Sequence, residues 1–347
     1  MMGGAAAGAL GFAPTGLTDG AGPRTKCRPA ISGALWALEA TSLALGESGW
    51  REELEQQRRI GFDLLWLCSV PAALDAPGDP VRVILDLCAK RKVRVILDTG
   101  SSNTWWNPFD VQSEIERCNS GIKRIGERFA GHPAFRCWYI PHEIYMAWGD
   151  FARKIDVLYP ALVERCKKAA DLPVSLSPFF ILDSDEMFGG GFRYNKPDEY
   201  ERYWTRLIKR SGLDIVMLQD SGEHFSFCTN ERRRPFFKAM SAACAASGAR
   251  MWGNVECAEV ECPSPAEYVK RYGRVHMSAV PNLPWRPVPI ERLRSKLELA
   301  AEYSEDIVTW GYREFCRPGI GAGAKSWYQD YRAYYAGLRA GDKLRHR

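Results

Sequence analysis

Short apolar runs alternate along the chain with longer segments in which apolar residues recur every three or four positions. Runs rich in Val, Ile, Trp and Phe are typical of buried strands, and the longer segments are typical of helices that bury one face. The strands are predicted at residues 31–38, 62–68, 93–97, 135–140, 173–177, 214–218, 250–255 and 306–310. The helices are predicted at residues 50–60, 80–90, 111–129, 151–169, 197–211, 234–246, 290–303 and 324–339.

This alternation predicts an α/β fold in which every strand is followed by a helix, as around a parallel sheet. A single-domain (β/α)8 TIM barrel over residues 30–342 fits the number and order of the segments. An open doubly wound sheet is the alternative. No GxGxxG motif follows the first strand, and the glycines 189–191 lie in a loop after the fifth strand, so a site for nucleotide phosphates is not expected.

Residues 1–29 differ from the rest of the chain: they are rich in Gly, Ala, Thr and Pro. The mildly apolar start resembles the middle region of a twin-arginine export signal without its preceding basic region. We therefore expect a truncated export signal and a periplasmic or secreted protein, with a disordered tail as the alternative. No run reaches the ~20 apolar residues that span a bilayer, so no membrane span is expected.

Composition narrows the possible functions. The formal charge of +5 is spread over many ionisable side chains, and the basic clusters 90–92 and 232–234 are typical of solvated helix faces, so nucleic-acid binding is not expected. Twelve Trp residues fit a site that stacks on flat apolar faces such as those of sugar rings. Eleven Cys residues without a CxxC pair predict neither a zinc site nor a redox dithiol, and at most one or two disulfides among Cys228, Cys257, Cys262 and Cys316.

In a TIM barrel the chemistry lies at the carboxyl ends of the strands, so the residues placed there are the candidates for a site. Polar and aromatic residues follow nearly every predicted strand. The candidates for substrate binding are Trp36, Glu39, Asp98, Trp105, His142, Tyr145, Trp148, Gln219, Asp220, Asn254 and Trp310. With five His residues and no HxH or HExxH spacing, neither a metal site nor a cofactor is predicted.

Two glutamates are the candidates for catalysis. Glu143 follows the apolar run 135–140 and Glu256 follows the run 250–255, where a solvated surface acid would not be expected. A desolvated carboxyl group holds its proton near neutral pH, as a general acid requires. By contrast, Glu223, Glu259 and Glu261 are interpreted as caps or ion-pair partners.

The positions of these two glutamates and of one tryptophan resemble those of a known group of enzymes. Glu143 after the fourth strand, Glu256 after the seventh and Trp310 at the end of the eighth resemble the large clan of retaining glycoside hydrolases built on TIM barrels. The resemblance implies that Glu143 is the acid/base, Glu256 the nucleophile and Trp310 a floor for the sugar. One departure is His142, which stands where that clan usually has Asn.

Four segments point to a narrower family. Gly-Phe-Asp-Leu-Leu at 61–65, Tyr-Ile-Pro-His-Glu at 139–143, Leu-Gln-Asp at 218–220 and Trp-Gly-Asn-Val-Glu at 252–256 resemble a bacterial family of glycosidase-like barrels catalogued as a domain of unknown function. The resemblance spans about residues 31 to 318.

The expected function is hydrolysis of a poly- or oligosaccharide with retention of configuration. If the two carboxyl groups lie ~5 Å apart, Glu256 is the nucleophile, whereas ~6.5 to 9.5 Å predicts inversion. Two alternatives remain. One is a carbohydrate-binding barrel without catalysis, and the other is a lyase or isomerase that uses Asp220 and His224 as acid and base.

Overall fold

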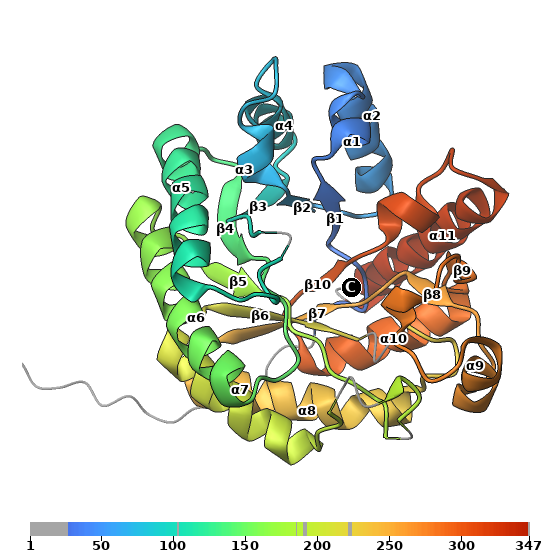
Figure 1. Ribbon diagram of the computed structural model, residues 1–347. Helices are drawn as coiled ribbons and strands as arrows, with labels where there is room; N and C mark the ends of the chain where they lie inside the picture. Colours follow the sequence, from blue (N-terminus) through green and yellow to red (C-terminus); the bar gives the residue numbers. More distant parts are fainter. Residues whose placement is uncertain (1–26, 103, 185, 190–192, 221–223, 346–347) are drawn as a thin grey trace, which may run out of the picture.

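The computed structural model describes residues 27–102, 104–184, 186–189, 193–220 and 224–345. Within them, eight parallel strands close into a barrel with helices around it, so the predicted TIM barrel is confirmed (Figure 1). The barrel strands are β1 (Gly33–Ala37), β2 (Leu64–Cys68), β3 (Arg94–Asp98), β4 (Phe135–Ile140), β5 (Val174–Leu176), β6 (Ile215–Gln219), β7 (Arg250–Asn254) and β10 (Ile307–Thr309). Each boundary lies within two residues of the predicted one.

The barrel closes because β1 pairs with β2 on one side and with β10 on the other. Alternate residues of each strand face opposite sides of the barrel wall. In β2, Leu64 and Trp66 belong to the apolar cluster that fills the interior, whereas Leu65 and Leu67 pack in the larger cluster that includes helix residues. The interior also holds Tyr139, whose ring meets Trp66 edge to face with centroids 4.7 Å apart.

The outer layer consists of the helices predicted from the sequence and a few short additions. Helix α4 illustrates why they begin where they do: the Asp79 carboxylate accepts a hydrogen bond from the Arg82 N–H, and Pro80 stands in the first turn. The long helices are α2 (Gly46–Arg59), α4 (Pro80–Lys90), α5 (Val111–Phe129), α6 (Gly149–Ala169), α7 (Pro197–Ser211), α8 (Asn230–Ser247), α10 (Ile290–Tyr303) and α11 (Ala322–Arg345). The short additions are α1 (Ala40–Leu43), α3 (Val70–Ala73) and the π-helical turn η3 (Tyr312–Cys316).

A small antiparallel unit between β7 and α10 was not predicted. It consists of β8 (Ala258–Val260), α9 (Pro265–Tyr272), the 3₁₀ turn η2 (Met277–Ala279) and β9 (Trp285–Pro287), with β8 paired to β9 (Figure 1). We call residues 258–287 the β8–β9 unit. Its three-residue strands are too short to give a periodic pattern.

Two of the acids interpreted as ion-pair partners stabilise the β8–β9 unit. Arg286 lies 3.1 Å from Glu259 and 2.5 Å from Glu261, and Glu259 also contacts Arg292 of α10 at 2.8 Å. The interpretation of Glu259 and Glu261 is therefore confirmed, whereas Glu223 lies outside the described residues.

The disulfides considered from the sequence are not formed. Cys257, Cys262 and Cys316 are buried free thiols, so no pair among the four candidate cysteines is joined. No helix in the described part of the chain is long and apolar enough to cross a membrane. The export signal expected in residues 1–29 falls largely outside the described residues, so export stays a prediction.

Candidate active site

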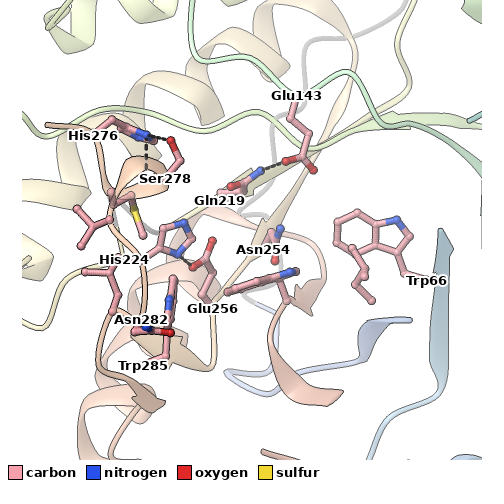
Figure 2. Close-up of a pocket in the computed structure, with 15 residues that line it drawn as sticks. Trp66, Glu143, Gln219, His224, Asn254, Glu256, His276, Ser278, Asn282 and Trp285 are labelled. Carbon is pink, nitrogen blue, oxygen red and sulfur yellow. Dashed lines mark hydrogen bonds and ion pairs between the residues drawn. The ribbon is translucent and has the colours of Figure 1, made fainter. Parts of the chain in front are cut away.

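A cavity of about 540 Å³ opens at the carboxyl ends of the barrel strands. Barrel strands supply one part of its lining and the β8–β9 unit supplies another (Figure 2). The lining residues are Leu35, Trp66, Glu143, Gln219, His224, Asn254, Glu256, His276, Met277, Ser278, Val280, Asn282, Leu283, Trp285 and Trp310. Both candidate catalytic glutamates are therefore in one pocket.

Glu143 lies just beyond β4 and is held by two hydrogen bonds. The Tyr139 hydroxyl, which comes from the barrel interior, donates to Oε1. The Gln219 Nε2 group donates to Oε2 at 2.8 Å (Figure 2). Burial raises the pKa of Glu143 to about 7, although these hydrogen bonds oppose the rise, and the nearby charge of Glu256 adds to it. Glu143 therefore retains its proton to near neutral pH, as a general acid must.

Glu256 lies just beyond β7 and its side chain is almost fully buried. The Nδ1 atom of His224 pairs with its Oε2 atom (Figure 2). His224 has a backbone φ of 61°, an unusual conformation for a residue with a side chain, and such conformations cluster at functional sites. The contact orients the Glu256 carboxyl group within the pocket.

Behind Glu256 lies a buried ion pair. The Asp220 Oδ1 atom accepts a hydrogen bond from the Glu256 backbone N–H at 3.0 Å, and its Oδ2 atom lies 3.3 Å from Lys296 Nζ. Lys296 also donates to the Glu256 carbonyl oxygen at 2.6 Å. Asp220 and Lys296, which lie outside the pocket lining, thus hold the backbone of Glu256 by hydrogen bonds.

Two amide side chains lie close to the glutamates. Gln219 donates both to Glu143 and to the Ser177 carbonyl oxygen, the latter at 2.9 Å. Asn254 donates from Nδ2 to the Ser177 hydroxyl at 3.1 Å, and its buried Oδ1 atom has no hydrogen-bond partner in the protein. Because a buried acceptor without a partner is costly, Asn254 Oδ1 is suited to receive a donor from a ligand.

An aromatic group forms the wall of the pocket next to Glu256. Trp285 of β9 stacks on Phe315 at 5.5 Å and meets Trp310 edge to face at 5.7 Å. Both tryptophans also contact the His224 ring. Trp310 was predicted for this position, whereas Trp285 enters only through the β8–β9 unit.

Of the residues predicted from sequence, five line the pocket: Glu143, Gln219, Asn254, Glu256 and Trp310. The structure places the others elsewhere, and the reasons are local. Trp36 is one residue along β1 from Leu35, so it faces the other side of the barrel wall, where the Arg313 guanidinium lies 4.6 Å from the ring centroid. Glu39 is exposed before α1.

His142 and Trp105 form a separate buried cluster. His142 is fully buried, its Nε2 atom lies 2.8 Å from Glu114 Oε1 of α5, and its ring meets the Trp105 ring at 5.1 Å. Glu143, the next residue along the chain, lines the pocket, whereas the His142 ring faces Glu114 of α5. His142 therefore takes no part in the lining of the pocket.

The remaining candidates also lie outside the lining. Asp98 accepts hydrogen bonds from the Ser69 and Val70 N–H groups, and burial raises its pKa to about 6. Tyr145 packs against Trp148, and the Arg193 guanidinium lies 5.0 Å from the Trp148 ring centroid. These residues organise the loops after β2 and β4.

Glu114, Cys118 and His142 are the one group in the described residues whose ligand atoms cluster closely enough to suit a metal, within 4.8 Å. Burial would raise the pKa of Glu114, but hydrogen bonds from His142 and from Ser102 outweigh it and lower the pKa to about 2. Burial raises the pKa of the Cys118 thiol, so a thiolate ligand is disfavoured. We interpret the group as a hydrogen-bond network that anchors the loop before Glu143.

Several residues of the pocket lining were not predicted from the sequence as site residues. Trp66 had a detectable signal, since it stands two residues before the end of an apolar strand and alternation turns it inward. His224 was considered only for the lyase or isomerase alternative. His276, Met277, Leu283 and Trp285 had no comparable signal because they lie in a segment without periodicity.

Comparison with known protein families shows to which family the chain belongs. The model of the family described as "Domain of unknown function (DUF4434)" matches residues 31–320. The chain belongs to the DUF4434 family. The resemblance seen in the sequence segments is thereby confirmed, and a comparison with curated proteins gave no match.

Solved structures similar to this DUF4434 barrel include proteins described as glycosidases. A "putative alpha-L-fucosidase" from Bacteroides thetaiotaomicron has a TM-score of 0.70 and 20% identity, with 88% of this chain and 93% of that chain covered. An endo-1,4-beta-D-mannanase from Thermotoga petrophila has a TM-score of 0.53 and 10% identity, with 88% and 99% covered. A GH2 beta-galacturonidase from Eisenbergiella tayi has a TM-score of 0.54 and 13% identity, and the match covers 89% of this chain and 51% of that one. At these identities the likeness shows a glycoside hydrolase-like TIM barrel and leaves the chemistry to the site.

Proposed function

We propose that this protein is a retaining glycoside hydrolase that acts on an oligo- or polysaccharide. The observation that carries the proposal is the pair Glu143 and Glu256, which line one pocket from the ends of β4 and β7 in different surroundings. Glu143 is desolvated and has a raised pKa, whereas Glu256 is paired with an imidazole nitrogen. One proton donor and one oriented carboxylate are what hydrolysis of a glycosidic bond requires.

In the first step Glu256 attacks the anomeric carbon while Glu143 transfers its proton to the departing glycosidic oxygen. A covalent glycosyl-enzyme forms and the carbon–oxygen bond to the leaving group breaks. In the second step Glu143, now ionised, takes a proton from water, and the water oxygen displaces Glu256 from the anomeric carbon. His224, Asp220 and Lys296 act as positioning residues, since they contact Glu256 or the backbone that carries it.

The test is hydrolysis of a panel of glycans and aryl glycosides by the purified protein, with the first-formed anomer followed by NMR. Retention supports the proposed mechanism, and inversion would reassign Glu256 from nucleophile to general base. Binding of glycans without turnover at any pH would favour the non-catalytic barrel. The lyase or isomerase alternative has lost support, because Asp220 is engaged by the Glu256 N–H and by Lys296 outside the pocket lining.

The pH dependence of hydrolysis should reflect Glu143. Because its pKa is raised to about 7, the protonated acid is lost as the pH rises through 7, and kcat/KM is expected to fall on the alkaline side of that value. Glu143→Gln should remove this limb and lower kcat/KM about 10²- to 10⁴-fold for substrates with ordinary leaving groups. Aryl glycosides with strongly acidic phenols need little protonation, so the loss in the first step should be much smaller for them.

The matched control is Glu116→Gln on α5. Glu116 is exposed and lies outside the pocket lining, so its variant should retain the wild-type pH profile. An alkaline limb near pH 7 that persists in Glu143→Gln would show that another group supplies the proton.

A further inference from the structure

We propose that the pocket selects an uncharged sugar and discriminates against uronic acids and other anionic sugars. This inference rests on the proposed function, because it names the substrate class of the same site. It depends on the charges in and around the pocket lining and on the aromatic wall.

In the part of the chain that the structure describes, the lining carries two acidic side chains and neither of the two strongly basic side chains, Lys and Arg. Among the described residues, Glu143 and Glu256 line the pocket and no Lys or Arg does. The two histidines of the lining already face polar groups of the protein: His224 is paired with Glu256, and His276 Nδ1 lies 2.7 Å from the Ser278 hydroxyl. Recognition of a carboxylate normally uses an Arg or Lys, so the lining lacks the usual partner for an anionic sugar.

The basic residues on the surrounding elements are directed elsewhere. Arg286 and Arg292 pair with Glu259, and Lys296 pairs with Asp220. Arg313 of η3 lies over the Trp36 ring on the outer side of β1 and donates to the Ser42 hydroxyl at 2.5 Å. Arg274, close to His276 in sequence, donates to the Glu186 carbonyl oxygen at 2.6 Å. A sugar carboxylate would therefore meet two acidic side chains with no Lys or Arg beside them in the described lining, and the basic group of the lining next to Glu256, His224, is already paired with it. Like charges brought together disfavour binding.

The other parts of the lining match a neutral sugar. Trp285 and Trp310 offer rings on which the apolar face of a pyranose can stack. Asn254 Oδ1 offers a buried acceptor for a hydroxyl hydrogen. Ring stacking and one or two neutral hydrogen bonds recognise hydroxylated rings without any charge on the ligand.

The experiment compares sugars that differ in one group. Methyl thioglycosides of glucose and galactose are titrated into the wild-type protein beside the corresponding uronic acids, in both anomers, and dissociation constants are measured by saturation-transfer NMR. These ligands resist hydrolysis, so binding is measured without turnover. In at least one pair the neutral sugar should bind at least about tenfold more tightly than its uronic acid. The ratio of the uronate dissociation constant to the neutral-sugar dissociation constant should be smaller at about 500 mM salt than at about 50 mM salt, because salt screens charge.

A cation added to the wall tests the cause. Ser278 is exposed and lines the pocket on the β8–β9 unit, so Ser278→Arg should bring a guanidinium to the site and lower the neutral-to-uronate ratio about tenfold. Ser278→Gln, which is long but uncharged, is the matched control and should leave the ratio unchanged. Both variants lose the hydroxyl beside His276, but the backbone N–H of residue 278 still faces His276 Nδ1 at 3.3 Å.

The outcomes separate the two proposals. Uronic acids that bind as tightly as their neutral partners would overturn the inference, while the proposed function would stand as long as Glu256→Gln abolishes hydrolysis. Selective binding of neutral sugars by a protein that hydrolyses nothing would uphold the inference and sink the proposed function. A protein that binds no sugar of either kind would overturn the inference, and it would contradict the proposed function as well if it hydrolysed no glycan of the panel.

Discussion

Glu256→Gln is expected to lower kcat for glycoside hydrolysis by at least about 10⁴-fold, since loss of a covalent nucleophile removes a whole reaction route. An amide oxygen is a far weaker nucleophile than a carboxylate and carries no charge to stabilise the oxocarbenium-like transition state. The fold should be unaffected, because glutamine has the same shape and its side-chain oxygen can still accept from His224. Steady-state kinetics, with circular dichroism and Tm as checks on folding, measure both effects.

The matched control for this variant is Glu261→Gln. Glu261 is close in sequence, exposed, and paired with Arg286 rather than facing the pocket. Its replacement should leave kcat within about twofold of wild type, as is usual for surface substitutions. A Glu256→Gln protein that keeps more than a tenth of the activity would remove Glu256 from the role of nucleophile.

Lys296→Met is expected to lower the free energy of unfolding by about 3 to 5 kcal/mol, the usual consequence of removing one partner of a buried ion pair. The side chains of Lys296 and Asp220 are only 4% and 1% exposed, so Asp220 would be left as a buried charge without its cation. The Glu256 carbonyl oxygen would also lose its 2.6 Å donor. Denaturant-induced unfolding near pH 7 measures the loss.

A second variant distinguishes the ion pair from the simple loss of a long side chain. The double variant Asp220→Asn/Lys296→Met removes both charges but keeps an acceptor for the Glu256 N–H, so it should recover most of the stability. Lys270→Met is the surface control: Lys270 is 80% exposed and lies 3.8 Å from Glu267, and its loss should change stability by less than about 1 kcal/mol. Equal losses in Lys296→Met and in the double variant would show that Asp220 does not depend on the cation.

The sequence pattern predicted the barrel well because strand and helix periods are local properties of the chain. The run 135–140 alternates its side chains regardless of what packs around it, and its structural counterpart β4 has the same bounds. The common position of strand ends in a barrel then brought Glu143 and Glu256 to one edge, although 112 positions separate them in sequence.

The same pattern wrongly predicted that residues next to the two glutamates also contact the substrate. His142 and Asp220 stand at strand ends as expected, yet one binds Glu114 and the other binds the Glu256 backbone. A side chain at a strand end can face the pocket, the helical layer or the next loop, and only the atoms around it decide which. A carboxylate that stabilises backbone and one that contacts substrate therefore look alike in sequence.

The sequence by itself determined the order of strands and helices and the closed barrel expected of eight such units, because both depend on short-range periodicity. It also determined the two glutamates at the ends of β4 and β7, because the site of a TIM barrel lies at the carboxyl ends of its strands. Only the tertiary structure decided the wall of the pocket. Trp285, Ser278 and His276 reach the site because β8 pairs with β9 and the connection between them lies against the barrel mouth. That arrangement, and with it the uncharged character of the wall, arises from long-range packing and ion pairing, which leave no periodic trace in the chain.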